Sequence, residues 1–274
     1  MKIDASERVV YAHNPLAEVV CQVQFDALPA LTQAEVAALQ ARFSTDMGHS
    51  VYQVEELTQV EYQVTFDGTA PAFSQQALPA NKIHHFLSAD GFWRVSFCAT
   101  FMALTCLKYS KWEEFRPVFF NAIDCFGDVL KTARVSRVGL RYKDVIEREP
   151  LGLAGVAWHE LIKPFMLGPL NPDALADKQT LTENDIGSLV SQYVLHLESC
   201  KLLLQSSLLM SLDGQRKAFL IDMDFFNDHA PALEQTITNR ASLIDQLNIL
   251  HGHAGDLFRR CIKEKLHDAL RPAA

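Results

Sequence analysis

Two aspartates, Asp222 and Asp224, stand on either side of Met223 within residues 219–226, a segment that alternates like a β-strand. Alternate side chains of a strand lie about 6.6 Å apart on one side, so two carboxylates at this spacing can share a divalent cation. Metal-dependent phosphoryl or nucleotidyl transfer uses such a pair, but the sequence upstream holds no Walker loop or comparable glycine cluster. The alternative is a solvated strand face that carries acids, because two exposed carboxylates repel by only about 1 kcal/mol in water.

A row of basic residues is the second candidate site. Arg137 and Arg141 share one face of the predicted strand 135–146, with Arg134 just before them and Lys143 just after. Such a row can bind a phosphate or an acidic partner. Gly139 lies between the arginines, where the missing side chain would let a ligand or another backbone approach closely. A solvated sheet face, or salt bridges to the excess acids, is the alternative interpretation.

The cysteines and histidines predict no metal site, cofactor or nucleophile. Six cysteines are scattered in apolar surroundings without a C-x-x-C pair, which is typical of reduced core thiols. His84 and His85 point to opposite faces of a strand, and His251 and His253 are two residues apart on a helix, so neither pair has ligand geometry. The sequence contains no G-x-S-x-G motif. The cysteines are Cys21, Cys98, Cys106, Cys125, Cys200 and Cys261.

Strands must position these residues, because period-2 alternation recurs along the chain. We expect hairpins at Ala89-Asp90-Gly91 and Asp213-Gly214, and a loop over residues 71–79. Three late strands are predicted over residues 189–197, 201–212 and 217–226. The predicted fold class is α+β, with antiparallel sheets and long amphipathic helices packed on one face.

Helices are predicted where apolar residues recur every three or four positions. Thr32 with Glu35 predicts a capped helix start, and Ser110 with Glu113 predicts a second one. Pro117 lies inside that second pattern and predicts a kink or a late start. A short helix is expected over residues 156–165, and a long C-terminal helix reaches Leu266.

The chain divides best after residue 147, where proline, glycine and charge concentrate. We therefore predict an N-terminal α+β half, residues 1–147, packed closely against a C-terminal α+β half, residues 148–274. Each half runs from antiparallel strands into one long helix. This order leaves a duplicated strand–strand–helix unit open, although residue identity between the halves is too weak to establish a repeat.

Composition limits the classes of function. With 274 residues, 49% hydrophobic and 21% charged, the chain can bury a sizeable core and is a globular protein. Its net charge of −8 makes nucleic-acid binding unexpected. The first residues lack the apolar core of a secretion signal, and no stretch of about 18 apolar residues could span a membrane. We therefore expect a cytoplasmic protein without membrane contact.

Three segments of the chain carry a resemblance to other proteins. They are Asn-Pro-Leu-Ala-Glu-Val-Val at residues 14–20, Tyr-Ser-Lys-Trp-Glu-Glu-Phe at residues 109–115 and Arg-Val-Gly-Leu-Arg-Tyr at residues 137–142. Together they resemble a sporadically distributed family of uncharacterised bacterial and archaeal proteins of similar length. The resemblance would cover essentially the whole chain, but it supplies no catalytic residue to carry over. A sporadic distribution implies an accessory role in phage defence or toxin control.

The sequence thus favours a non-enzymatic binding or regulatory module that binds a protein partner or forms a homodimer, with Arg137 and Arg141 as candidate binding residues. No cofactor and no catalytic residue are predicted. The alternative is a metal-dependent phosphoryl or nucleotidyl transferase with Asp222 and Asp224 as cation ligands and Arg137 or Arg141 as phosphate clamps. A third hypothesis is a small-molecule pocket enclosed by a curved sheet and the long helix; a cavity of several hundred cubic ångström there would distinguish it.

Overall fold

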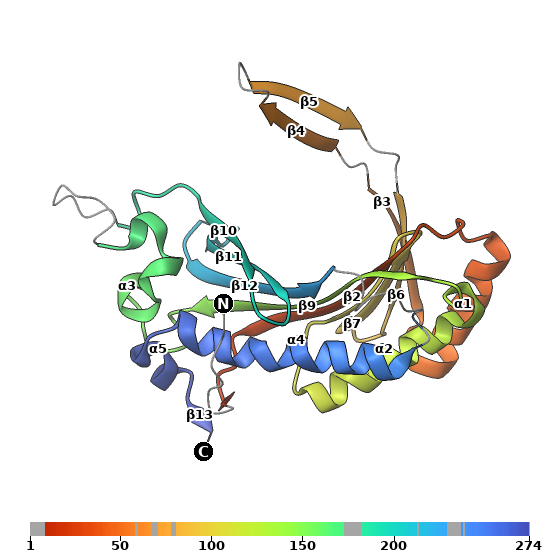
Figure 1. Cartoon of the computed structure of the whole chain (residues 1–274). Helices are drawn as coiled ribbons and strands as arrows, with labels where there is room; N and C mark the ends of the chain where they lie inside the picture. Colours follow the sequence, from red (N-terminus) through yellow and green to blue (C-terminus); the bar gives the residue numbers. More distant parts are fainter. Residues whose placement is uncertain are drawn as a thin grey trace.

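The fold is built on one nine-stranded antiparallel sheet (Figure 1). The computed structural model describes residues 9–57, 60–66, 71–77, 81–172, 182–212, 214–228, 237 and 239–273. In spatial order the strands are β10 (Leu189–His196), β11 (Lys201–Met210), β12 (Lys217–Asn227), β9 (Val135–Glu147), β2 (Leu16–Phe25), β8 (Phe101–Cys106), β7 (Trp93–Cys98), β6 (Asn81–Leu87) and β3 (Val51–Leu57). The α+β class is confirmed.

Two strand pairs lie outside this sheet. β4 (Val60–Phe66) and β5 (Pro71–Ala77) pair with each other as an antiparallel hairpin (Figure 1). β1 (Val10–Tyr11) pairs with β13 (Pro272–Ala273), so the beginning and the end of the described chain lie side by side.

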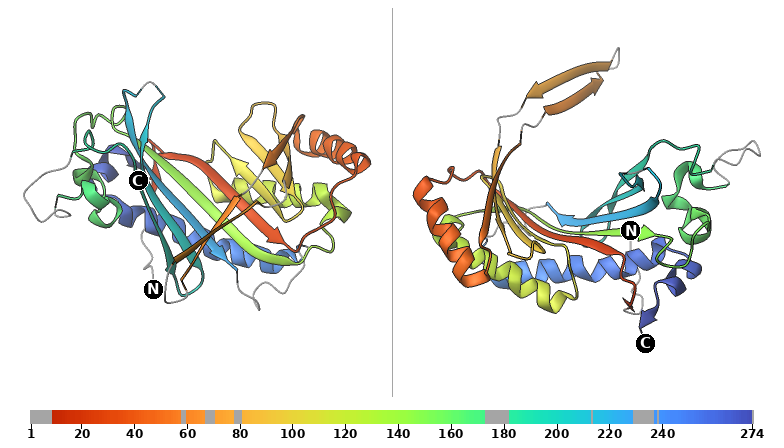
Figure 2. Two further views of the ribbon diagram at one scale, coloured as in Figure 1. Left: turned by 90° about the horizontal axis from the view of Figure 1, so that it is seen from above. Right: turned by 180° about the vertical axis from the view of Figure 1, so that it is seen from behind.

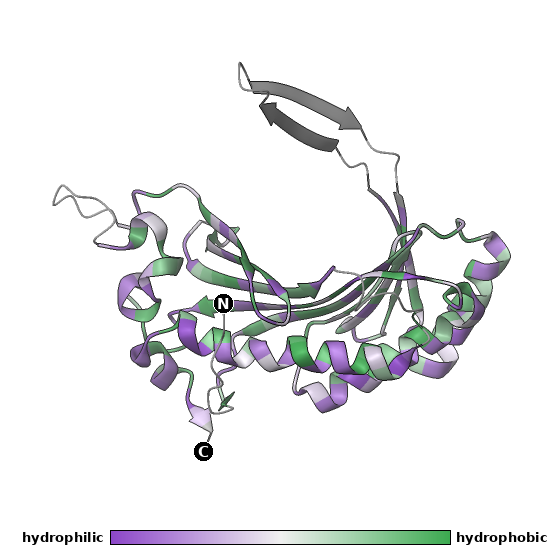
Figure 3. Cartoon of the chain, in the orientation of Figure 1, coloured by the Kyte–Doolittle hydropathy of each residue, from purple (hydrophilic) through white to green (hydrophobic). Residues whose placement is uncertain are grey.

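Helices α2 and α4 run along one side of the sheet, and the sheet curves away from them at both ends (Figures 1 and 2). The helices are α1 (Gln33–Met47), α2 (Trp112–Phe126), α3 (Trp158–Leu161), α4 (Arg240–Cys261) and α5 (Glu264–Ala269), with short 3-10 turns at Gly127–Val129, Pro164–Met166 and Gly168–Leu170. Hydrophobic and hydrophilic residues alternate along α2 and α4 (Figure 3). We call the sheet face opposite α2 and α4 the open face.

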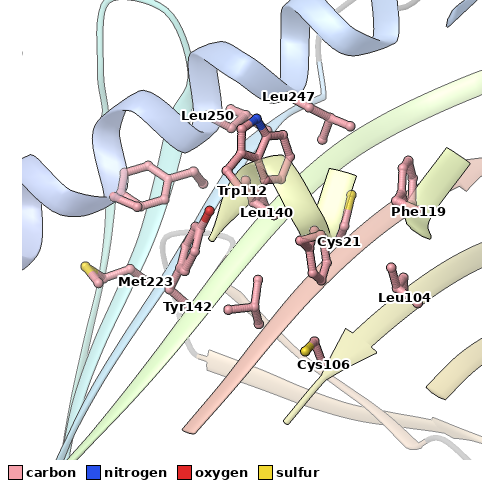
Figure 4. Packing of buried hydrophobic residues seen from close by; sticks show 14 of the residues in the cluster. Cys21, Leu104, Cys106, Trp112, Phe119, Leu140, Tyr142, Met223, Leu247 and Leu250 are labelled. Atoms are coloured by element: carbon pink, nitrogen blue, oxygen red, sulfur yellow. The ribbon is translucent and has the colours of Figure 1, made fainter. Parts of the chain in front are cut away.

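The alternation of β9 shows how the sequence divides the two faces. Val138, Leu140 and Tyr142 are buried, and Tyr142 points toward α4 (Figure 4), whereas Arg137 and Arg141 point to the open face. The helices seal this apolar side with fully buried aromatic rings, each worth about 1.5–3 kcal/mol of transfer free energy. α4 packs against β9 and β12 on the apolar side. This packing fixes the position of the strand that carries Arg137 and Arg141 on its opposite face.

Several local predictions are confirmed. Thr32 and Glu35 form a reciprocal capping box at the start of α1, and Gly48 is the C-cap after its last residue, Met47. The predicted hairpin at residues 89–91 joins β6 to β7, and the three late strands match β10, β11 and β12. Gly214 belongs to the second predicted hairpin, whereas Asp213 lies outside the described residues.

Of the region expected to be a loop, residues 71–79, the part from Pro71 to Ala77 is strand β5, so the prediction is wrong there, whereas residues 78 and 79 lie outside the described residues. The loop prediction relied on Pro71. A proline at the first residue of a strand is nevertheless compatible with pairing, because it removes no hydrogen bond from the interior of the strand. Phe66 pairs with Pro71, and the register then continues to Val60 with Ala77. Pairing with the preceding strand, β4, therefore overrides the loop signal within residues 71–77.

Two predictions about α2 also need correction. The Ser110–Glu113 cap does not form: α2 has Lys111 at its N-cap, and the Ser110 hydroxyl donates to the Glu114 carboxylate at 2.5 Å instead. The late start near Pro117 is also wrong, since α2 begins at Trp112. Pro117 is exposed, so the carbonyl that loses its partner can be solvated.

The C-terminal helix ends earlier than predicted. α4 stops at Cys261 because Ile262 takes an extended conformation and bridges Ile162. Lys263 donates its backbone N–H to the Leu161 carbonyl at 2.7 Å. The same bridge shortens the helix expected over residues 156–165 to the four residues of α3.

The boundary predicted after residue 147 coincides with the end of β9, which pairs with β2 of the first half and β12 of the second. The main sheet is therefore continuous across that point. Among the helices of the described ranges, none combines the length and the apolar character needed to cross a lipid bilayer.

Candidate functional site

The four residues singled out from the sequence come together on the open face as two ion pairs between β9 and β12. Arg137 donates from Nη2 to Asp224 Oδ2 at 2.7 Å. Arg141 binds Asp222 with two hydrogen bonds, from Nε to Oδ1 at 2.7 Å and from Nη2 to Oδ2 at 2.5 Å. Each acid thus binds a guanidinium, and the bidentate contact is among the strongest that a carboxylate can form.

Gly139 makes the first of these pairs possible. A Cβ at this position would lie 2.6 Å from Arg137 Nη1 and 3.3 Å from Asp224 Oδ1. The Arg137 guanidinium also lies over the Phe226 ring, 4.4 Å from its centroid, and donates to Gln22 Oε1 at 3.2 Å. The space predicted for a ligand at Gly139 is therefore occupied by the Arg137 side chain.

The solvated-face interpretation is wrong for Asp222, which is 3% exposed. Burial raises the pKa of Asp224, and the Arg137 charge opposes that rise. Beside these pairs, Lys143 binds Glu18 at 3.0 Å. The transferase hypothesis requires the two acids and the two arginines to converge, and they do. A divalent cation would, however, have to displace a guanidinium group from each acid.

A Ser–His–Glu arrangement on the open face was not predicted. His85 contacts Ser96 Oγ through Nδ1 at 2.9 Å and Glu55 Oε2 through Nε2 at 3.2 Å, across β7, β6 and β3. Cross-strand register is the signal that unites them, because Ser96 stands directly opposite His85. Ser96 is 7% exposed within paired strands, where the neighbouring N–H groups belong to the ladder rather than to an oxyanion hole.

One group of three described residues has metal-ligand spacing, namely Glu264, His267 and Asp268 on α5. Glu264 binds Arg259 at 2.5 Å, and His267 Nδ1 is bonded to the Tyr11 hydroxyl at 2.8 Å. Two of the three side chains are thus already engaged, and the group lies apart from Asp222 and Asp224.

A cavity of about 440 Å³ lies on the helix side of the sheet, between the C-terminal half of α4 and the inward-facing residues Tyr142 and Asp144 of β9 and Met223 of β12. We call it the α4 cavity. Figure 4 shows Tyr142 and Met223, two of its lining residues, pointing from the sheet toward α4. The lining is completed by β1, the start of β2 and the segment that precedes α2. A volume of several hundred cubic ångström is the feature that distinguishes the small-molecule hypothesis, and it is present.

Asp144 is the buried acid of this cavity. It lies on the inward face of β9, is 5% exposed and contributes to the lining. Among the residues that the structure describes, none forms a hydrogen bond or ion pair with its carboxylate. Burial raises the pKa of Asp144 to about 8, with a further contribution from the charge of Asp222. The alternation of β9 contained the signal: an aspartate at an inward position between Tyr142 and Ile146.

The other polar groups of the α4 cavity have partners. The Tyr142 hydroxyl and His251 Nδ1 are 2.8 Å apart, and burial raises the pKa of Tyr142 well above its usual value. Lys111 binds Glu114 at 2.9 Å, and Arg259 binds Glu264. The two cations of the lining are therefore neutralised by acids outside it. The sequence analysis found no metal-ligand geometry for His251. In the structure His251 is part of the cavity wall.

Two glycines of α4, Gly252 and Gly255, border the cavity and are exposed. A Cβ built on either one would meet no atom within 4 Å, so neither glycine is needed for close packing. Glycine in a helix interior costs about 1 kcal/mol relative to alanine. The helix thus gives up about 2 kcal/mol beside the cavity without a packing requirement for either glycine.

No protein-family model matches the chain, and no curated protein matches it. Among solved structures, the S. pombe Pct1 RNA triphosphatase in complex with the Spt5 CTD has 8% identity and a TM-score of 0.18, covering 97% of this chain and 87% of that chain. A second structure of S. pombe Pct1 RNA triphosphatase has 11% identity and a TM-score of 0.14, covering 96% and 87%. TM-scores this low support no conclusion about fold or function.

Proposed function

We propose that this chain is a non-enzymatic binding module whose ligand is a small molecule held in the α4 cavity. The observation that carries the proposal is a cavity of about 440 Å³ that contains a buried carboxyl group without a partner among the described residues. Ligand sites in proteins are mostly apolar hollows of 300–1,000 Å³, roughly, with a few polar groups that fix orientation. The α4 cavity has this size and this chemistry.

Energetics support the proposal. Burying a carboxyl group without a partner costs free energy, and so does each glycine inside a helix. Asp144, Gly252 and Gly255 impose both costs at one place. A ligand that bonds to Asp144 and fills the space beside the glycines would recover part of that free energy.

The proposal includes the layout predicted from the sequence, with long helices packed on one face of the sheet. It is supported by the contact of α4 with β9 and β12, which forms the roof of the cavity. The polar wall groups Tyr142 and His251 bond to each other, which suits recognition better than turnover. The regulatory part of the prediction, in phage defence or toxin control through a partner or a second copy, rests on the sequence resemblance.

The test is a small-molecule screen by thermal shift against the wild-type chain and Gly255→Leu. Leucine at the cavity opening should abolish stabilisation by true ligands, because its side chain enters the space that they need. Ala241→Leu is the matched control, since residue 241 is an exposed position of α4 outside the cavity lining. Hits that stabilise all three proteins equally would count against the α4 cavity as the binding site.

A second candidate function is metal-dependent phosphoryl or nucleotidyl transfer by Asp222 and Asp224, with Arg137 or Arg141 as phosphate clamps. The convergence of the four side chains on one face supports it. Titration with Mg²⁺ or Mn²⁺ tests it: a cation that binds at these acids must shift the NMR signals of the Arg137 and Arg141 side chains. An absence of such shifts at millimolar cation would eliminate this candidate.

A further inference from the structure

We propose that the α4 cavity selects a small organic cation with an apolar body, whose ammonium group contacts Asp144. This inference rests on the proposed function, because it names the class of ligand for the same cavity. It follows from the charges of the lining, from the aromatic character of the walls and from the way in which a buried carboxylate discriminates among ligands.

When Asp144 is ionised, above the pKa of about 8 that burial gives it, the part of the cavity beside it carries a negative charge. Lys111 and Arg259 belong to the lining, but each has an acid partner outside it, Glu114 and Glu264. Asp144 has no such cation among the described residues. A ligand cation would therefore supply the missing partner, whereas a ligand anion would be repelled in a medium of low dielectric constant.

The walls favour the same ligand. Aromatic rings attract cations through the negative charge on their faces, and this attraction grows when water is excluded. Rings also bury the apolar body of an amphipathic ligand. The aromatic lining residues are Tyr11, Tyr109, Tyr142, His251 and Phe258.

Several titratable groups surround Asp144 and set the pH dependence of binding. Tyr11 of β1, Tyr142 of β9, Asp222 of β12 and Cys261 of α4 all interact electrostatically with it. Arg259 and His251 of α4, Lys111 and Tyr109 before α2, and the acid Asp256 complete the ionisable lining. The cation binds the ionised form of Asp144, so its affinity should rise about tenfold per pH unit and level off above the carboxyl pKa.

The experiment compares three probes of similar shape with the full chain by isothermal titration and ligand-observed NMR. They are 2-phenylethyl-trimethylammonium, which is charged at every pH, the neutral 2-phenylethanol and the anion 3-phenylpropionate. We expect the cation to bind about ten- to hundredfold more tightly than the alcohol at pH 9, the range of a charge-assisted contact. The anion should bind most weakly.

Asp144→Asn is the decisive variant, because asparagine matches the carboxyl group in shape but carries no charge. The cation should lose about ten- to hundredfold in affinity, while the alcohol changes less than about twofold. Retained binding of the alcohol shows that the variant is folded and its cavity intact. In the variant the pH dependence of cation binding between pH 6 and 9 should also disappear.

The outcomes separate the two proposals. If the alcohol or the anion binds as tightly as the cation, or if Asp144→Asn leaves cation binding unchanged, the charge selectivity is refuted while the cavity remains a binding site. If none of the probes binds the wild-type chain at 10 mM, roughly the upper concentration for ligands of this size, the cavity itself is not a binding site and both proposals are refuted.

Discussion

Asp144→Asn should stabilise the ligand-free protein, and the gain should grow with pH. Asp144 has a pKa of about 8 in the fold, against 3.8 for an unburied aspartate. A carboxyl group whose pKa is raised by folding binds its proton more tightly in the native state. Its penalty is therefore absent below about pH 4, increases by about 1.4 kcal/mol per pH unit above it, and levels off above about pH 8.

The magnitude follows from the two pKa values. The difference between 3.8 and about 8 corresponds to a destabilisation on the order of 5 kcal/mol at pH 9. Asparagine cannot ionise, so the variant avoids this penalty and retains a side chain of the same shape. We expect the two proteins to have similar unfolding free energies at pH 4 and to differ by several kcal/mol at pH 9.

Urea unfolding followed by circular dichroism at pH values from 4 to 9 is the assay, with Asp224→Asn as a contrast. The pKa of Asp224 is also raised by burial, but its ion pair with Arg137 means that the substitution removes a partner and should destabilise the fold. Equal pH slopes for the wild type and Asp144→Asn, or a variant that is less stable at pH 9, would refute the conclusion that Asp144 is an uncompensated buried acid.

Three further predictions concern the ion pairs and the glycines. Gly139→Ala should cost about 1–3 kcal/mol in urea unfolding, because its Cβ would lie 2.6 Å from the Arg137 guanidinium; a neutral result would mean that Arg137 moves at no cost. Asp222→Asn should cost about 3–5 kcal/mol, since it removes the charge that Arg141 binds with two hydrogen bonds, and unchanged stability by the same assay would show that the pair contributes nothing. Gly255→Ala should raise stability by about 1 kcal/mol through helix propensity; a loss of stability in calorimetry would show that the glycine is needed for packing.

Local patterns were enough to predict most of the sheet. Strands β9 to β12 were found from alternation and turn residues, and the capping box of α1 came from two residues three apart. The errors occur where the conformation of a segment is decided by its pairing with another segment. β5 exists because it pairs with β4, and α4 ends where Ile262 bridges Ile162, and neither pairing is visible in the local sequence.

The sequence indicated that the arginines could form ion pairs but not which acid each one binds. Salt bridges to acids were an expected alternative for the arginines, yet the sequence did not indicate which acids. Strand register decides this: β12 lies beside β9, and Arg137 reaches Asp224 across Gly139. A residue pattern within one strand contains no information about its neighbour in the sheet.

Asp144 was overlooked because its strand was interpreted by its apolar positions. Val138, Leu140, Tyr142 and Ile146 define the inward face, and Asp144 is the one charged residue in that register. Its meaning depends on the α4 cavity, which forms only when β1, β9 and α4 come together. A charged residue at an inward position of an otherwise apolar strand is nevertheless a signal that the sequence alone can provide.

The two faces of the sheet treat buried charge in opposite ways. On the open face, Asp222 and Asp224 are each held by an arginine, so their charges are compensated within the protein. On the helix side, Asp144 is more than nine-tenths buried and has no cation among the described residues. A protein that builds ion pairs on one side of β9 does not lack the means to build one on the other, and the cost at Asp144 is large relative to typical folding stability. An uncompensated acid beside a hollow of this size is therefore best explained by a partner that comes from outside the chain.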